Sequence, residues 1–330
     1  MSDHVSEPIW LIGAGGMARA HAKVLRALDR PFHIVGRGAV SASAFAQEIG
    51  SPVTAGGLEK WLKDSPQPAG HAIVAVPIPE LAEAACALAR FGVRRILVEK
   101  PGGLDPAEIE SVAAVARETG VAMFVAYNRR FFASAARARR LIEEDGGAVS
   151  FTFEFTELAD VVAQSGHSAG VKRNWFLANS SHVVDLAFFL GGSPAHLYPL
   201  SAGSLPWHER AERFAGCGST GAGALFSYIA DWASAGRWGV EVMTRRRRLI
   251  LRPLESLSVQ EKGRFEINAV SLDDSLDREF KPGLYRQMQA FLGGTDQDAL
   301  VDIQGHAARV REVFVPMLSG GRIAGEAAAS

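Results

Sequence analysis

Short apolar segments alternate with amphipathic segments through the first third of the chain. Strands are predicted where apolar residues stand together, and helices where apolar residues recur every three or four positions. The predicted strands are Ile9–Ile12, Phe32–Val35, Ala72–Val76, Ile96–Val98 and Ala122–Ala126, and the predicted helices are Ala18–Leu28, Ala42–Ile49, Leu81–Phe91 and Pro106–Thr119. Repeated strand–helix–strand units predict a parallel sheet covered by helices on both faces, with right-handed connections.

The pattern changes after about residue 128. Phe131–Glu143 predicts a basic amphipathic helix, and Ala148–Glu157 alternates so that Val149, Phe151, Phe153 and Phe155 share one face. This alternation is typical of a strand with one buried face. The remaining predicted elements are strands at Leu197–Ser201, Arg213–Cys217, Gly223–Ile229, Gly239–Met243 and Leu249–Leu251, and a helix at His182–Leu190. We therefore predict an α/β protein: a doubly wound parallel domain over residues 1–128, and an α+β domain with an open, mainly antiparallel sheet over residues 129–330.

Composition narrows the class of protein. The chain has 330 residues and a formal net charge of −1, so nothing favours a nucleic-acid or membrane partner. Arg245–Arg248 is the one dense basic cluster; we interpret it as a solvated hairpin or strand end, and a phosphate-binding patch is the alternative. Cys86 and Cys217 lack the spacing of a metal site, and no metal is predicted. We expect both cysteines to be buried and reduced, in a cytoplasmic protein; Met1–Pro8 lacks the pattern of a signal peptide.

A glycine turn, Gly13-Ala14-Gly15-Gly16-Met17-Ala18, follows the first predicted strand and opens a helix. The first glycine permits a tight turn, the second lets the backbone approach a pyrophosphate, and the helix N-terminus attracts the phosphates. In this context the pattern predicts a Rossmann domain that binds a dinucleotide. The predicted contacts are Gly13, Gly15, Gly16, Met17 and Ala18, with Val76 and Pro77 at the end of the third strand.

The end of the second strand bears on which dinucleotide is bound. NAD-binding domains usually carry an acidic residue there, whereas this chain has Gly36-Arg37-Gly38. Arg37 can bind a 2′-phosphate through charge-assisted hydrogen bonds, and Ser41 can add a hydroxyl contact. We predict NADP(H) in preference to NAD(H). The alternative is that Arg37 points into solvent or stacks on adenine.

Lys100 stands at the end of another predicted strand, in Glu99-Lys100-Pro101. Ligands of parallel sheets bind at the carboxyl ends of strands, so we expect Glu99, Lys100 and Asn128 to contact the cofactor near its reactive ring. A cation there can polarise a substrate hydroxyl or carbonyl during hydride transfer. The proline is a candidate for a cis peptide bond.

Four segments together resemble the glucose-fructose oxidoreductase / inositol dehydrogenase / rhizopine catabolism (Gfo/Idh/MocA) family. They are the glycine turn with His21, Glu99-Lys100-Pro101, Tyr127-Asn128-Arg129-Arg130-Phe131, and Ser181-His182-Val183-Val184-Asp185-Leu186. The resemblance implies NAD(P)-dependent oxidation or reduction of sugars or polyols. It implies a catalytic role for Lys100 and an acid/base role for His182. It also implies a homodimer or homotetramer assembled through the C-terminal sheet.

The residues around His182 leave its role partly open. We expect His182 in the first turn of a helix capped by Ser180 or Ser181, where the helix dipole favours a neutral imidazole; a packed structural histidine is the alternative. Asp185 is expected to cap the same helix. Many family members carry an aspartate four residues before this histidine, where the chain has Ala178 beside Asn179. An asparagine can orient a sugar hydroxyl but cannot act as a base at neutral pH.

Other side chains are candidates for the substrate side of the cleft. Asn128 can bond substrate or ribose, and Trp175 can stack on a sugar or close the core. Tyr285 can supply a phenol or act structurally. If two or more of Arg129, Arg130, Lys172 and Arg173 converge, they favour an anionic substrate. The sequence thus predicts an NADP(H)-dependent oxidoreductase acting on a carbohydrate-like substrate; a non-catalytic cofactor-binding regulator on the same fold is the alternative.

Overall fold

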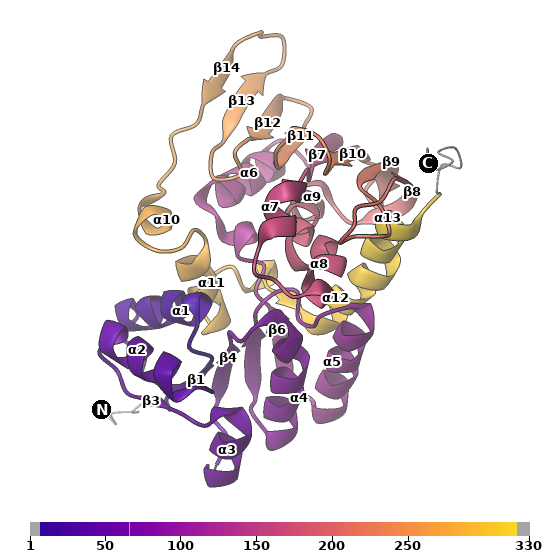
Figure 1. Cartoon of the computed structure of the whole chain (residues 1–330). Coiled ribbons are helices and arrows are strands. Elements are labelled where there is room, and N and C mark those ends of the chain that lie inside the picture. Colours follow the sequence, from indigo (N-terminus) through magenta and orange to yellow (C-terminus); the bar gives the residue numbers. More distant parts are fainter. Residues whose placement is uncertain (1–6, 66, 322–330) are drawn as a thin grey trace. The chain divides into compact units, whose positions relative to one another are not determined.

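The computed structural model describes residues 7–65 and 67–321 (Figure 1). Most of Met1–Pro8, considered above for a signal peptide, lies outside that range. The described chain forms two compact units: an N-terminal unit of residues 7–127 and 277–307, and a C-terminal unit of residues 128–276 and 308–321. The first boundary lies one residue from the predicted one. Residues 277–307 nevertheless join the N-terminal unit, whereas the predicted division placed all of 129–330 in the second domain.

A seven-stranded sheet is the centre of the N-terminal unit, with strand order β15-β6-β5-β4-β1-β2-β3. Its neighbouring strands are parallel, except that β15 runs antiparallel beside β6 at the edge. The strands are β1 (Ile9–Ile12), β2 (Phe32–Val35), β3 (Val53–Thr54), β4 (His71–Val74), β5 (Arg95–Val98), β6 (Ala122–Val125) and β15 (Val301–Asp302). The strand order reverses beside β1, which puts a switch point at the carboxyl ends of β1 and β4.

Helices connect these strands, and their ends follow from local chemistry. The helices are α1 (Gly16–Ala27), α2 (Ala39–Ile49), α3 (Gly57–Asp64), α4 (Leu81–Phe91), α5 (Pro106–Thr119) and α11 (Leu284–Phe291), with 3-10 turns at Ile78–Glu80 and Gln297–Ala299. In α5, the Asp105 carboxylate accepts from the Glu108 amide at 2.9 Å, and the Glu108 carboxylate accepts from the Leu104 amide at 2.7 Å. This reciprocal cap, with Pro106 in the first turn, explains where the helix begins. Two helices, α10 (Ser275–Glu279) and α12 (Ile303–Arg309), carry the chain across the unit boundaries.

The C-terminal unit contains an eight-stranded sheet of order β14-β13-β12-β11-β7-β10-β9-β8. Its strands pair antiparallel except for the parallel pair β7 and β10. The strands are β7 (Ser150–Glu154), β8 (Pro194–Ala202), β9 (Arg213–Thr220), β10 (Leu225–Asp231), β11 (Gly239–Met243), β12 (Arg247–Leu251), β13 (Ser258–Glu261) and β14 (Ile267–Ala269). The helices are α6 (Ala133–Glu144), α7 (Ala159–Gln164), α8 (Ala169–Arg173), α9 (Ser181–Gly191) and α13 (Val315–Ser319), with a 3-10 turn at Asn128–Phe131 and π-helical turns at Phe176–Ser180 and Val310–Phe314. The predicted α/β class and the mainly antiparallel second sheet are confirmed.

Aromatic side chains fill the core of the C-terminal unit. Phe151, Phe153 and Phe155 are buried on one face of β7, as their alternation predicts. Phe188 of α9 packs edge-to-face on Phe151 and Phe153, with ring centroids 5.8 and 5.5 Å away. Each such ring contributes about 2–3 kcal/mol by leaving water. Val149 was predicted to share this face, but it precedes β7 and is exposed.

The other face of this sheet carries exposed apolar side chains. Tyr198 and Leu200 of β8 are 66% and 44% exposed, and Leu225 and Ile229 of β10 are 63% and 59% exposed. Cross-strand pairing of Cys217 with Tyr198 places that thiol on the same face, and it is exposed. The prediction that Cys217 is buried was therefore wrong; Cys86 is buried as predicted.

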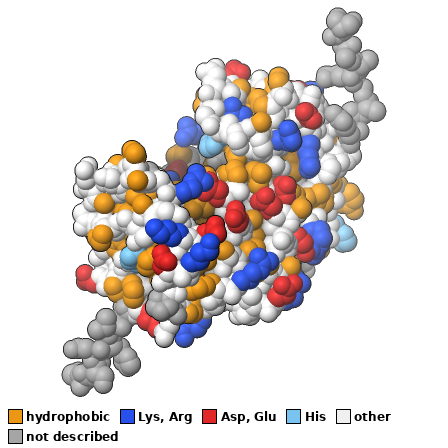
Figure 2. Space-filling model, turned by 60° about the horizontal axis from the view of Figure 1, so that its bottom comes forward, with side chains coloured by type: hydrophobic (Ala, Val, Ile, Leu, Met, Phe, Trp, Pro, Cys, Tyr) orange, Lys and Arg blue, Asp and Glu red, His pale blue; other side chains and the backbone are white. Residues whose placement is uncertain are grey.

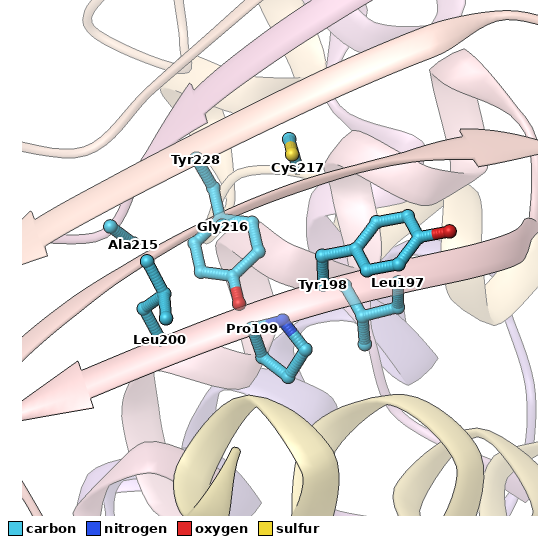
Figure 3. Close-up of a pocket in the computed structure, with 8 residues that line it drawn as sticks. All are labelled: Leu197, Tyr198, Pro199, Leu200, Ala215, Gly216, Cys217 and Tyr228. Atoms are coloured by element: carbon cyan, nitrogen blue, oxygen red, sulfur yellow. The ribbon is translucent and has the colours of Figure 1, made fainter. Parts of the chain in front are cut away.

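A shallow cavity of about 580 Å³ lies at the β8 edge of this sheet (Figure 3). The Tyr228 ring extends from β10 across Gly216 of β9, where an added Cβ would come within 2.5 Å of the ring. Burial raises the pKa of the Tyr228 phenol. The cavity lining is almost entirely apolar, and the exposed stripe above borders it.

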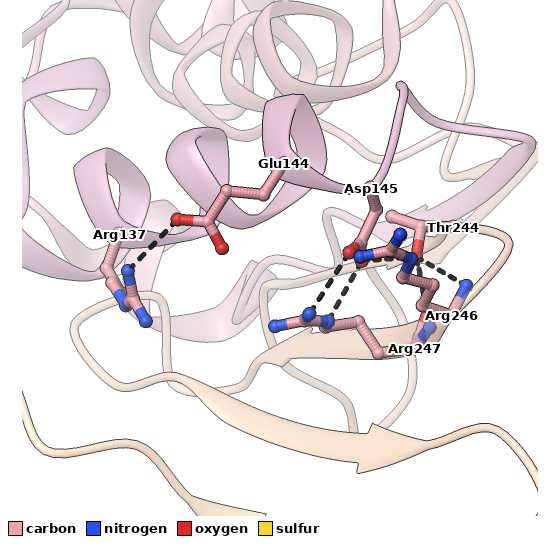
Figure 4. Close-up of polar contacts among 6 residues, drawn as sticks. All are labelled: Arg137, Glu144, Asp145, Thr244, Arg246 and Arg247. Atoms are coloured by element: carbon pink, nitrogen blue, oxygen red, sulfur yellow. Dashed lines mark hydrogen bonds and ion pairs between the residues drawn. The ribbon is translucent and has the colours of Figure 1, made fainter.

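The arginine cluster at 245–248 is more ordered than a solvated strand end. Arg247 bonds Asp145 with a nitrogen–oxygen distance of 3.0 Å, and Thr244 donates to the same buried carboxylate at 2.7 Å (Figure 4). Arg248 pairs with Glu241 across β11 and β12. Two of the four arginines therefore form ion pairs within the C-terminal unit. On the face drawn in Figure 2, basic side chains are interspersed with acidic ones.

Within residues 7–65 and 67–321, none of the helices combines the length and the apolar character that crossing a bilayer requires.

Candidate active site

The glycine turn has the geometry its sequence predicts. Gly13 has φ = 122°, and a Cβ there would lie 2.3 Å from the Ala75 carbonyl oxygen, so only glycine fits between β1 and β4. Gly15 is the N-cap of α1, no side chain caps the helix, and its first turn carries no acidic residue. Added Cβ atoms at Gly15 and Gly16 would meet nothing within 4 Å. The first amides of α1 therefore lie beside open space, as pyrophosphate binding requires.

That open space is a cavity of about 1150 Å³ inside the N-terminal unit. Of the predicted cofactor contacts, those that line it are Gly13, Gly15, Gly16, Met17, Arg37, Val76 and Pro77. Ala18, also a predicted contact, is fully buried and is not part of the cavity lining. Glu99, Lys100 and Asn128 are not part of this lining, and the side chain of Ser41 lies outside the described structure. Size, open amides and the position at the switch point fit a dinucleotide.

Sequence reasoning missed one wall of this cavity. Gly56–Glu59, Leu62 and Lys63 line it from α3 and the turn before it, because the two-residue strand β3 and the eight-residue helix α3 gave no clear pattern. Carboxylates were missed as well: Glu59, Glu80 and Glu83 all line the cavity. The only sequence signal for them was their position after a predicted strand or turn.

Arg37 lies beside this cavity but is not a lone cation. Its Nη1 donates to Glu80 Oε1 at 2.7 Å, and its side chain is 76% exposed. Glu80 ends the 3-10 turn that follows β4, so the ion pair joins the segments that follow β2 and β4, the two strands on either side of β1. The alternative that Arg37 simply points into solvent is incomplete, because a carboxylate holds it.

Lys100 follows β5, and buried histidines hold the residues on either side of it. His21 of α1 donates from Nε2 to Glu99 Oε1 at 2.9 Å, and His306 of α12 donates from Nε2 to the Pro101 carbonyl at 2.9 Å. Both imidazoles are fully buried, and the Lys100–Pro101 peptide is cis, as anticipated. These two hydrogen bonds hold the residue before Lys100 and the residue after it, and so restrict the backbone that carries the Lys100 side chain. His306 was not recognised from the sequence, since nothing local links it to Pro101.

His182 does not stand at a helix N-terminus. The π-helical turn Phe176–Ser180 runs directly into α9, and Ser180, with φ = −63° and ψ = −26°, is helical and makes no capping hydrogen bond. Both predicted caps were therefore wrong: Ser181 donates to the Leu177 carbonyl at 2.7 Å instead. Because His182 is inside a continuous helix, the dipole argument for a neutral imidazole no longer applies. The side chain of His182 is buried in this unit.

Asp185 is an ion-pair partner rather than a cap. Arg130 binds both its oxygens, with distances of 2.7 and 2.6 Å, and Arg309 donates to Oδ1 at 2.6 Å. Asp185 is 1% exposed, so this carboxylate is shared by two guanidinium groups away from water. The cluster ties the turn that begins at Asn128 to the helix that carries His182.

A second buried carboxylate orients Asn179. Glu157 accepts from Asn179 Nδ2 at 3.1 and 3.0 Å and from the Ser180 hydroxyl at 2.6 Å. A carboxylate can only accept, so the amide must present its NH₂ group to Glu157 and its carbonyl oxygen away from it. Burial lowers the pKa of the nearby Arg129 guanidinium to about 10, although Glu255 and Glu157 act in the opposite direction.

The remaining candidates do not form one cationic cluster. Arg130 is engaged by Asp185, and Lys172 donates to the Ala163 carbonyl at 2.6 Å. Arg173 is exposed, and Trp175 packs its ring 5.3 Å from that of His167. Tyr285 lies in α11 of the N-terminal unit and contacts the Phe280 ring at 5.0 Å. Asn128 is buried at the start of the C-terminal unit.

The fold and the glycine turn define the class of protein: one with a dinucleotide-binding Rossmann domain. Residues 9–127 match the model of the Gfo/Idh/MocA oxidoreductase family, NAD-binding Rossmann fold. Over these residues the chain is thus similar to the Rossmann domain of that family, and two of the four segments, the glycine turn with His21 and Glu99-Lys100-Pro101, lie within the match. Among curated protein sequences, none matches the chain.

Solved structures resemble nearly the whole chain. UDP-N-acetylglucosamine 3-dehydrogenase GnnA from Acidithiobacillus ferrooxidans is 16% identical, with 95% of this chain and 97% of that chain covered and a TM-score of 0.72. Levoglucosan dehydrogenase in complex with NADH and L-sorbose is 18% identical, with 95% and 96% covered and a TM-score of 0.74. An oxidoreductase from Agrobacterium radiobacter in complex with NAD+, L-tartaric acid and magnesium is 13% identical, with 92% of each chain covered and a TM-score of 0.74. At these identities the likeness establishes the fold.

Proposed function

We propose that the protein is an NADP(H)-dependent oxidoreductase that transfers hydride to or from a carbon of a sugar, sugar derivative or polyol. The observation that carries the proposal is the cavity in which the open N-terminus of α1 and Arg37 lie together. The family match of residues 9–127 supports the cofactor class. The similar structures named for a UDP-sugar dehydrogenase and a levoglucosan dehydrogenase support a carbohydrate-like substrate.

In this proposal the glycine turn binds the pyrophosphate and Arg37 binds the 2′-phosphate. A nicotinamide held there would supply the hydride acceptor or donor for the reacting substrate carbon. Lys100 polarises the reacting oxygen, and its position depends on the bonds of His21 to Glu99 and of His306 to Pro101. His182 exchanges the hydroxyl proton. Glu99 and Asn128 position the reactive end of the cofactor, and Tyr285, Arg173 and Trp175 are secondary candidates for substrate contact.

Asn179 is proposed to recognise a substrate hydroxyl. Because Glu157 binds its NH₂ group, Asn179 offers an oxygen acceptor to its other side. An acceptor matches a hydroxyl donor and disfavours a carboxylate or phosphate at that point. With Arg130 and Lys172 engaged elsewhere, this arrangement favours a neutral polyol group over an anionic one.

Replacement of Lys100 by alanine tests whether the protein is an enzyme. The wild-type protein is assayed against a panel of sugars, polyols and nucleotide sugars by the absorbance of reduced nicotinamide. We expect Lys100→Ala to lose turnover by at least about a hundredfold while the cofactor dissociation constant stays within about twofold. Full activity in the variant would remove Lys100 from the mechanism. Cofactor binding by the wild-type protein with no turnover on any substrate would favour the regulator.

The exposed face of the C-terminal sheet is proposed as the surface of a homodimer or homotetramer. This face carries an apolar stripe of the kind that marks interfaces, formed by Tyr198, Leu200, Leu225 and Ile229. Light scattering with size-exclusion chromatography tests this assignment. We expect a Leu225→Lys, Ile229→Lys double variant to be monomeric with unchanged secondary structure. A wild-type monomer, or an unaffected oligomer in the variant, would contradict it.

A further inference from the structure

The cavity holds more negative than positive side chains where the adenosine end of a dinucleotide is expected. Its charged lining consists of the carboxylates Glu59, Glu80 and Glu83 and the cations Arg37 and Lys63. Lys63 forms an ion pair with Glu59, one helical turn away in α3; the distance from Lys63 Nζ to Glu59 Oε1 is 2.7 Å. Arg37 is therefore the cation that remains for a ligand, and Glu80 already binds it.

The Arg37–Glu80 pair has a geometry that a ligand can alter. Only one of the five guanidinium donors, on Nη1, contacts Glu80 in the described structure, and the Arg37 side chain is 76% exposed. An exposed pair of this kind contributes little to the stability of the fold. The ion pair therefore matters less for the stability of the fold than for the binding of a phosphate placed beside Arg37.

We propose that Glu80 sets the NADP(H)-to-NAD(H) preference by competing with the 2′-phosphate for Arg37. This inference rests on the proposed cofactor function and names a residue that moderates it. A 2′-phosphate beside Arg37 brings a dianion close to the Glu80 carboxylate, so repulsion offsets part of the attraction to the guanidinium. A 2′-hydroxyl carries no charge and leaves the pair intact. The wild-type protein accordingly prefers NADP(H) by less than Arg37 alone would give.

The size of the effect follows from charge and exposure. The repulsion between two like charges a few ångströms apart is weak where water dominates the screening and stronger where water is partly excluded. For a phosphate of about −2 charge, removal of the Glu80 charge is expected to tighten NADP+ binding about 5- to 10-fold at low salt. The gain should shrink in 0.5 M salt because screening weakens interactions between exposed charges.

The experiment compares Glu80→Gln with the matched control Glu83→Gln. Glu83 lines the same cavity but forms no ion pair with Arg37 in the described structure. Dissociation constants for NADP+ and NAD+ are measured by calorimetric titration of the full-length protein, without substrate. We expect Glu80→Gln to tighten NADP+ binding 5- to 10-fold and to change NAD+ binding less than twofold, with no such selective change in Glu83→Gln.

A double variant separates this inference from the proposed function. In an Arg37→Ala background, Glu80→Gln should improve NADP+ binding less than in the wild-type protein, because the competition for Arg37 is gone and only the direct repulsion between Glu80 and the phosphate is relieved. An unchanged NADP+ to NAD+ ratio in Glu80→Gln, or an equal gain in Glu83→Gln, would overturn the role of Glu80 and leave the cofactor proposal standing. Failure of the wild-type protein to bind either nucleotide would overturn both.

Discussion

Replacement of Asp185 by asparagine tests whether the buried ion pairs of Asp185 stabilise the C-terminal unit. The carboxylate is 1% exposed and accepts from Arg130 and Arg309, whose side chains are 7% and 20% exposed. An amide of the same size supplies one neutral acceptor and turns its NH₂ group toward donors. Breaking a buried ion pair in this way costs about 3–5 kcal/mol, since it leaves charge buried without a partner. We expect Asp185→Asn to lose about that much free energy of unfolding.

Urea denaturation followed by circular dichroism measures the loss, with Glu143→Gln as control. Glu143 pairs with Arg139 one turn away on the surface of α6, and such a pair contributes about 0.3–0.5 kcal/mol. An Arg130→Met, Asp185→Leu double variant should be less destabilised than Asp185→Asn, because it buries apolar groups in place of charge. A loss below about 1 kcal/mol in Asp185→Asn would refute the argument that the buried cluster holds this unit together.

Three further outcomes are expected. Gly13→Ala should lower the free energy of unfolding by about 3 kcal/mol and abolish NADP+ binding, because φ = 122° and the 2.3 Å approach to a carbonyl oxygen exclude a Cβ; urea melts and calorimetric titration check this. Burial lowers the pKa of His208, so below pH 6.5 the unfolded chain binds a proton that the folded chain does not; stability should fall from pH 7 to pH 5, less steeply in His208→Gln. His21→Leu should lower kcat about tenfold while the NADP+ dissociation constant stays within twofold, since Glu99 loses its partner beside Lys100.

Local patterns were enough to predict the glycine turn and most strands. The glycine turn has a recognisable local sequence between a strand and a helix, and the phenylalanines at and beside β7 alternate along the chain, so both could be predicted from neighbouring residues. The cis peptide before Pro101 was also anticipated. Short elements such as β3 and α3 lack enough residues to show a period, and one wall of the cofactor cavity was missed for that reason.

Long-range partners could not be predicted from local patterns. The carboxylate of Asp185 has a cap-like position in sequence, yet it meets Arg130 and Arg309, 55 and 124 residues away. His306 reaches Pro101 across 205 residues. The placement of Ser180 inside a π-helical turn depends on packing rather than on its preference for helix caps. Side-chain type predicted chemistry here, whereas tertiary contacts decided the partner.

The membership of residues 277–307 in the first unit affects the order in which the chain can fold during synthesis. The edge strand β15 and the buried His306 belong to the N-terminal unit but are translated after residues 128–276. All eight strands of the C-terminal unit are thus translated while the sheet of the N-terminal unit still lacks its edge strand β15, and while the Pro101 carbonyl beside Lys100 still lacks its hydrogen bond from His306. On a ribosome, the unit that begins first would be completed late, and a nascent chain stopped before residue 301 would expose the backbone edge of β6.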